Sequence, residues 1–169
     1  IGGGDLNTIG GDKSSETQYN GTYNSTSASG SAAIYSLIGG GYRNTISKEP
    51  YSVILGGQQN FVGGTHSAIV GGYSHTVGIG SASFIGGGWD HSISQGDFGS
   101  IVGGYKNKLL RSDYAFIGGG ETVSGNTISD AAYSAVVGGY KSKIEGNTTK
   151  GLSSGSFIGG GKENTIENS

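Results

Sequence analysis

The sequence predicts an all-β fold, a β-solenoid or β-roll of about nine coils of 15–17 residues each. Three observations predict it. Glycine supplies 37 of the 169 residues, and each glycine inside a helix costs about 1 kcal/mol relative to alanine. An apolar residue followed by Gly-Gly recurs along almost the whole chain. The apolar segments are short, mostly β-branched or aromatic, and bounded by Gly, Asn and Ser, which is typical of strands.

The composition narrows the function classes. A formal net charge of −2 gives no basic surface for nucleic acid. The absence of cysteine excludes disulfides and cysteine-ligated zinc. No apolar run approaches the roughly 20 residues of a membrane span, so no membrane insertion is expected. The chain begins with Ile1 and not with Met, and we expect residues 1–169 to be one repeat segment of a longer protein.

The apolar residue before each Gly-Gly anchors the repeat. These anchors are Ile1, Ile38, Leu55, Val70, Ile85, Val102, Ile117, Val137 and Ile158. Their spacings separate a long form of 17 residues, with three glycines, from a short form of 15, with two. The longer spacings predict inserted loops at about residues 10–36, 122–125 and 145–156.

Each unit carries an apolar pair and, further on, a single apolar residue such as Ile46 or Leu109. Neighbouring residues on a strand point to opposite faces, so a pair that is apolar at both positions indicates a strand buried on both sides. We expect one member to fill the coil and the other to contact a second chain. The residues expected at this oligomer interface are Leu37, Ile54, Ile69, Phe84, Ile101, Phe116, Val136 and Phe157. The alternative is a wide, flat coil in which both members point inward.

The units of the type Ser-x-Ile-Val-Gly-Gly-Tyr-x-Asn-x-Val resemble the head repeats of trimeric autotransporter adhesins, and similar repeats occur in phage and viral tail fibres. The resemblance covers residues 36–169 and part of 1–9, and it departs from the adhesin pattern in its extra glycines and in a period longer than about fourteen residues. It implies a parallel homotrimer of left-handed β-rolls with apolar residues facing the three-fold axis. It also implies a stiff extracellular, cell-surface or virion stalk or head that attaches to a host or other surface.

Two polar columns are candidates for binding. The asparagine column contains Asn7, Asn44, Asn60, His75, His91, Asn107, Asn126, Ser142 and Asn164. Side-chain amides at corners can bond the backbone of adjacent coils, so we expect a structural ladder. His75 and His91 fall in adjacent coils, and in a trimer their six imidazoles could hold a metal or an anion. No other metal and no cofactor is expected.

Aromatic residues give the candidate ligand site. Tyr73, Trp89 and Tyr105 follow the glycines of consecutive coils and either stack on one another or receive sugar rings. Tyr19 and Tyr23 lie in the first insertion, where Tyr, Ser, Gly and Asn suit adaptable recognition. A glycan-binding module is therefore the alternative to a structural fibre segment, with a host or surface glycan or receptor as the partner.

A polysaccharide-degrading solenoid enzyme is the remaining alternative. Such an enzyme needs carboxylates that converge within several ångströms. In the repeat alignment no column is shared by Asp90, Asp97, Asp113, Glu121, Asp130 and Glu145. We therefore expect no catalysis.

Overall fold

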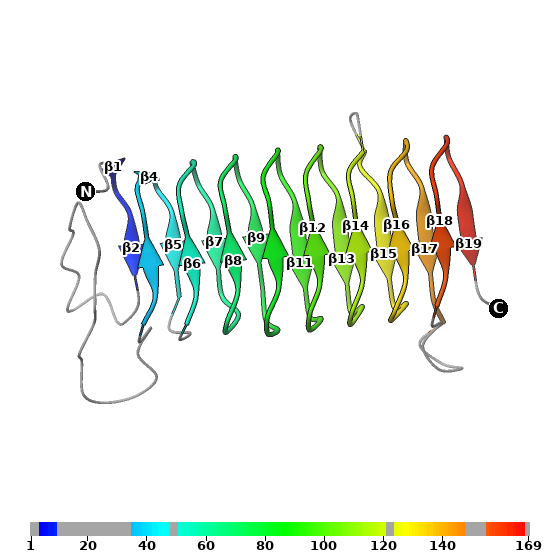
Figure 1. The fold of residues 1–169 in the computed structure, drawn as a ribbon, viewed down its shortest axis with the longest axis horizontal. Helices are drawn as coiled ribbons and strands as arrows, with labels where there is room; N and C mark the ends of the chain where they lie inside the picture. The colour runs from blue at the N-terminus through cyan, green and yellow to red at the C-terminus, as the bar shows by residue number, and fades with distance from the viewer. Residues whose placement is uncertain (1–3, 10–34, 48–50, 121–123, 148–154, 168–169) are drawn as a thin grey trace.

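A computed structural model describes residues 4–9, 35–47, 51–120, 124–147 and 155–167. In this part of the chain the backbone winds into stacked coils that form a rod, with the two termini at opposite ends (Figure 1). Every pairing between strands is parallel, and no helix occurs among the described residues. The predicted all-β solenoid is confirmed.

Two long parallel sheets run along the rod. The first contains eight strands, and neighbouring strands come from successive coils. Its members are β3 (Leu37–Ile38), β6 (Val53–Ile54), β8 (Ala68–Ile69), β10 (Phe84–Ile85), β12 (Ser100–Ile101), β14 (Phe116–Ile117), β16 (Ala135–Val136) and β18 (Phe157–Ile158).

The second sheet contains nine strands. Its members are β2 (Thr8–Ile9), β5 (Thr45–Ile46), β7 (Phe61–Val62), β9 (Thr76–Val77), β11 (Ser92–Ser94), β13 (Lys108–Leu110), β15 (Thr127–Ser129), β17 (Lys143–Glu145) and β19 (Thr165–Glu167). The pair β1 (Gly4–Asp5) and β4 (Gly41–Tyr42) starts a third, narrow edge, which isolated bridges from Tyr42 to Tyr105 continue.

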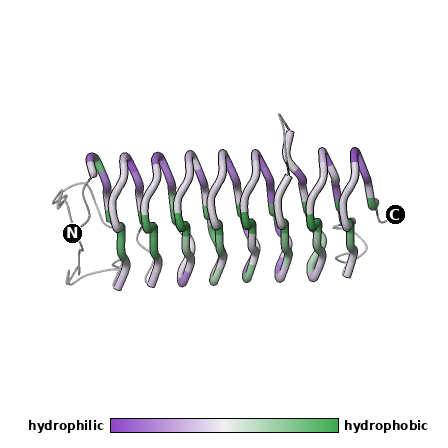
Figure 2. The backbone as a smooth tube through the Cα atoms, turned by 45° about the horizontal axis from the view of Figure 1, so that its top comes forward, coloured by the Kyte–Doolittle hydropathy of each residue, from purple (hydrophilic) through white to green (hydrophobic). Residues whose placement is uncertain are grey.

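The core consists of two apolar columns, one from each long sheet. The eight-stranded sheet contributes Ile38, Ile54, Ile69, Ile85, Ile101, Ile117, Val136 and Ile158. The nine-stranded sheet contributes Ile46, Val62, Val77, Ile93, Leu109, Ile128 and Ile144. All are buried, and Figure 2 shows the hydrophobic segments aligned in rows along the rod. Identical neighbours one coil apart, about 4.8 Å away, therefore form a continuous interior.

The hydrogen-bonded register refines the repeat length. Ile69, Ile85, Ile101 and Ile117 are direct partners and follow one another at 16-residue intervals, while Ile54 to Ile69 takes 15. The predicted range of 15–17 residues holds, but the alternation of a 17-residue and a 15-residue form does not. In the short form the Gly-Gly anchor lies one position later in the register, because Leu55 and its equivalents occupy the place of the first of three glycines.

The corners explain the glycine-rich turns. Gly41 has φ of 93°, and a Cβ there would overlap the carbonyl oxygen of Gly57 in the next coil. The left-handed conformation and the close approach of two backbones both require glycine. The residue before each asparagine-column position is also left-handed although it is not glycine, as at Arg43 and Lys106.

Several expectations fall outside the described residues. They concern Tyr19 and Tyr23, nearly all of the first insertion, and the central parts of the insertions at 122–125 and 145–156.

Candidate functional site

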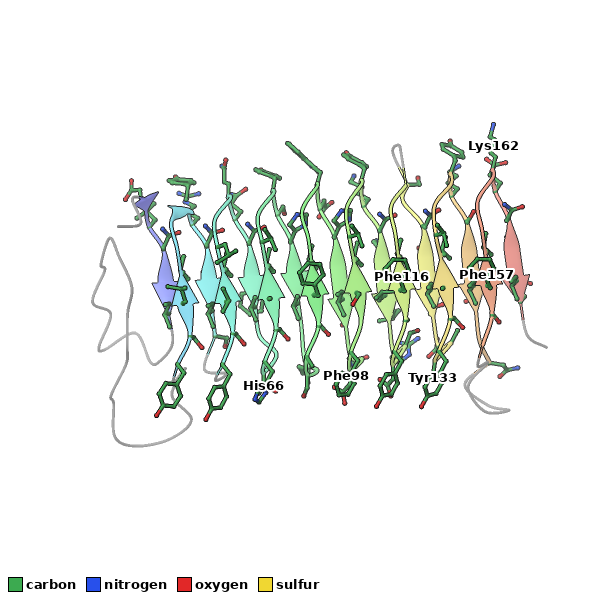
Figure 3. All side chains as sticks on the ribbon, viewed as in Figure 1. His66, Phe98, Phe116, Tyr133, Phe157 and Lys162 are labelled. Atoms are coloured by element: carbon green, nitrogen blue, oxygen red, sulfur yellow. The ribbon has the colours of Figure 1, made fainter. Side chains whose placement is uncertain are left out.

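The outer surface of the eight-stranded sheet carries an exposed apolar face. One row lies at the first strand position: Leu37, Val53, Ala68, Phe84, Ser100, Phe116, Ala135 and Phe157. A second row lies two residues later and contains the half-exposed Leu55, Val70, Val102 and Val137. We call these two rows the apolar face; Phe116 and Phe157 mark it in Figure 3.

Side-chain volumes on the apolar face compensate one another. Where the first row has phenylalanine, the second has glycine, and the ring lies over that glycine: a Cβ on Gly86 would sit 3.4 Å from Cε1 of Phe84. Phe116 covers Gly118 in the same way, at 3.3 Å. Where the first row has alanine or serine, the second has valine. Each coil thus presents apolar bulk of similar size, and the face stays filled along its length.

The structure corrects half of the expected oligomer-interface residues. Leu37, Phe84, Phe116 and Phe157 point outward as expected. The other four lie in the coil interior and are fully buried: Ile54, Ile69, Ile101 and Val136. The error comes from the Gly-Gly anchor, which shifts by one residue between repeat forms, and a shift of one residue exchanges the two faces of a strand.

The asparagine column forms the expected ladder. Oδ1 of Asn44 accepts the backbone N–H of Asn60 (3.1 Å), and Oδ1 of Asn107 accepts that of Asn126 (2.7 Å). The Nδ2 group donates to glycine carbonyls, as from Asn107 to Gly103 (2.8 Å). From Asn44 to Ser142 every member is buried. Each amide therefore satisfies backbone groups that would otherwise lie buried without a partner.

His75 and His91 replace asparagine within this ladder. Nδ1 of His75 accepts the backbone N–H of His91, and Nδ1 of His91 accepts that of Asn107, both at 3.1 Å. The rings stack in parallel with centroids 4.9 Å apart. Their Nε2 atoms lie buried without a hydrogen-bond partner of good geometry. Nδ1 thus does the work of the asparagine oxygen.

The expectation of a metal or anion site at these histidines across a trimer is wrong in its geometry. Both side chains are at most 1% exposed, so they cannot meet the imidazoles of another chain. Their Nδ1 lone pairs are already engaged. Across the described ranges, no cluster of three or more His, Cys, Asp or Glu side chains could hold a metal ion.

Burial makes the two histidines sensitive to acid. Desolvation, followed by the repulsion from His91, lowers the pKa of His75 to about 4, and desolvation also lowers the pKa of His91. Between pH 6.5 and about 4 the unfolded chain binds protons that the folded imidazoles refuse, so stability falls as the pH falls through this window.

We therefore expect the melting temperature to drop between pH 7 and pH 5, and to drop less in a His75→Asn/His91→Asn variant. Asparagine supplies the acceptor oxygen that the rest of the column uses and has no proton to gain. Thermal melts of both proteins across this range measure the difference, and parallel pH profiles would show that the histidines do not titrate on unfolding.

The predicted aromatic column is a stack whose rings cover one another. Tyr73 and Trp89 have centroids 4.2 Å apart, and Trp89 and Tyr105 are backbone-bridge partners. The Lys106 ammonium lies 5.3 Å from the centre of the Tyr105 ring. A stacked row presents ring edges to solvent, whereas a sugar needs a ring face. Sugar binding by Tyr73, Trp89 and Tyr105 stays a prediction.

Sequence reasoning missed a second aromatic row, which we call the aromatic corner. Its members stand two residues before each strand of the eight-stranded sheet: Tyr35, Tyr51, His66, Ala82, Phe98, Tyr114 and Tyr133. All have φ between 53° and 60°, and most are exposed. The available signal was an aromatic residue or histidine before the serine or small residue that precedes each apolar strand.

Two acidic residues share a column, contrary to expectation. The backbone N–H of Asp97 donates to Oδ1 of Asp113 (2.9 Å), and Oδ1 of Asp97 accepts the N–H of Ser81 (2.7 Å). Asp130, by contrast, forms a two-point ion pair with Arg111, at 2.6 and 2.8 Å. These carboxylates satisfy the backbone or a guanidinium, which is a structural use of the acidic groups.

Within the described residues, no helix has the length and apolar character needed to cross a membrane. No protein-family model, curated protein or solved structure matches the chain.

Proposed function

We propose that this chain is a rigid segment of an extracellular, cell-surface or virion fibre or adhesin, and that three copies associate through the apolar face. The observation that carries the proposal is the apolar face itself. Its phenylalanines and valines are 37–64% exposed in one chain. Contiguous exposed apolar surface on this scale marks a contact with another molecule.

The repeat of the apolar face favours a second copy of the same chain as the occupant. Its side chains rise by one strand spacing per coil, about 4.8 Å. From Ala68 onward, bulk alternates between phenylalanine in one coil and valine in the next. Only a surface with the same rise and the same two-coil alternation matches it over the whole length, and another rod of this kind has both.

The opposite sheet indicates a closed assembly. The outward positions of the nine-stranded sheet are mostly polar, such as Thr45, Thr76, Lys108 and Lys143. A rod with one apolar and one polar face hides the first by turning it towards a shared axis. Three parallel copies around such an axis are what the resemblance to adhesin heads implies.

Stiffness is the property that such an assembly would use. Backbone hydrogen bonds connect each coil to the next at several points, for instance Ser100 to Ala115, Val102 to Ile117 and Tyr105 to Gly120. A stack bonded in this way resists bending and holds length between an anchor and a tip. Inserted loops on this scaffold would serve attachment to a host or other surface.

The solution mass of the fragment tests the stoichiometry. We expect light scattering after size-exclusion chromatography to give three times the chain mass of 17.0 kDa. A stable, soluble species of 17.0 kDa at micromolar concentration would rule out the assembly.

A matched pair of variants tests which face is used. Phe116→Lys places a charge on the apolar face, and we expect it to yield monomers that retain the β circular-dichroism spectrum. Phe61→Lys is the control, because Phe61 has the same exposure, 38% against 37%, but lies on the outer side of the nine-stranded sheet. Dissociation by Phe61→Lys alone would assign the interface to the wrong sheet.

A further inference from the structure

The aromatic corner contains one step without a ring. Tyr51 and His66 stack with centroids 4.8 Å apart, as do Phe98 and Tyr114, while Tyr114 and Tyr133 stack at 4.9 Å. Between His66 and Phe98 the row passes through Ala82. Figure 3 labels His66 and Phe98 along the same edge of the rod.

Ala82 occupies the same backbone position as its aromatic neighbours. Its φ is 55°, against 53° for His66 and 56° for Phe98. Its N–H donates to the carbonyl of Thr65, the residue before His66, and the N–H of Phe98 donates to Ser81, the residue before Ala82. The Cβ of Ala82 therefore points where the rings of the row point, and only a methyl group fills that step.

The missing ring leaves a slot of definite width. His66 and Phe98 are two coils apart, so their ring planes are separated by about 9.6 Å, twice the strand spacing. A planar ring inserted over Ala82 would have a centroid about 4.8 Å from each wall, within the 4.5–7 Å preferred by aromatic pairs. Inside the row, this slot is where His66 and Phe98 offer open ring faces.

The surroundings of the slot add an apolar and an anionic contact. Ile79, three residues before Ala82 in the same coil, is 78% exposed. Asp97 precedes Phe98, and its Oδ1 accepts the N–H of Ser81, so its carboxylate lies beside the floor of the slot. The next residue in that acidic row, Asp113, adds a second negative charge. The nearest cation of the following coil, Arg111, is held by Asp130.

We propose that the slot over Ala82, between the rings of His66 and Phe98, binds one planar aromatic cation. The two ring faces stack on the ligand, Ile79 covers its edge, and the carboxylates of Asp97 and Asp113 favour a positive charge. This site is separate from the apolar face and does not depend on how many copies associate.

Thioflavin T, a planar aromatic cation, is a suitable probe. We expect titration followed by fluorescence to show saturable binding to the wild-type protein. Ala82→Tyr fills the slot with the residue that the row carries at positions 51, 114 and 133, and we expect at least about tenfold weaker binding. Ala82→Gly keeps the slot open and accepts the positive φ, so binding should persist.

Charge is tested separately. Asp97→Asn retains an oxygen that can accept the Ser81 N–H but loses the negative charge, and we expect weaker binding with a smaller dependence on salt. Equal affinities for wild type and Ala82→Tyr would overturn the proposal, because the dye would then bind elsewhere, for example on the apolar face. Measuring the mass of each variant keeps this result apart from a failure of the proposed association.

Discussion

Replacing Asn107 by alanine is expected to lower the free energy of unfolding by about 2–5 kcal/mol, because two backbone groups lose their partners inside the rod. The amide nitrogen of Asn126 loses the Oδ1 acceptor at 2.7 Å, and the carbonyl of Gly103 loses the Nδ2 donor at 2.8 Å. The side chain of Asn107 is fully buried, so water cannot replace either bond. Urea unfolding at fixed protein concentration measures the loss.

Two control variants separate the ladder from other causes. Asn164→Ala removes a member of the same column that makes the same kind of bond, to Gly160 at 2.6 Å, but is exposed; its cost should stay below about 1 kcal/mol. Asn107→His should recover part of the loss, since His75 and His91 use Nδ1 as the acceptor in this position. A large effect at Asn164 or none at Asn107 would contradict the role of the ladder.

Much of the fold could be predicted from sequence because the chain repeats one unit. A column of asparagine, histidine and serine at a fixed offset from apolar residues indicates a corner, whatever the exact path of the chain. The stacked strands, the core residues Ile46 to Ile144 and the asparagine ladder all follow from that column. Hydrogen bonding between coils then adds to what the pattern already specifies.

The face of each apolar residue could not be predicted as securely, because it depends on a shift of one position. Leu55 and Ile38 both precede Gly-Gly, yet Ile38 pairs with Ile54. The third glycine of the long form is not an insertion: it takes the place of Leu55 or Val102 and makes room for a phenylalanine ring in the same coil. Only the register reveals this exchange of volume between neighbouring positions.

The aromatic corner escaped prediction for a different reason. Non-glycine residues with φ near 55° are uncommon, and bulky ones are costly at isolated turns. Here Tyr114 and Tyr133 adopt that conformation because their N–H groups bond to Asp97 and Asp113 of the preceding coils and their rings stack. Contacts between coils thus favour a backbone conformation that local propensity disfavours, and a single repeat gives no sign of it.

The neighbouring residues Ile101 and Val102 provide the sharpest test of the register. Ile101→Ala is expected to cost about 2–5 kcal/mol, because a fully buried side chain in the middle of the core column is removed and its neighbours Ile85 and Ile117 cannot close the cavity. Val102→Ala should cost at most about 1 kcal/mol, since Val102 is already 49% exposed on the apolar face.

The two variants also differ in what they change. Loss of Ile101 should lower the urea midpoint whether or not the chains associate, because it weakens the packing within each coil. Loss of Val102 should act on association, so its effect should grow as the protein concentration falls. A greater loss of stability from Val102→Ala than from Ile101→Ala would mean that the strand faces the other way, and the apolar face would then lie inside the coil, with nothing left for a second chain to cover.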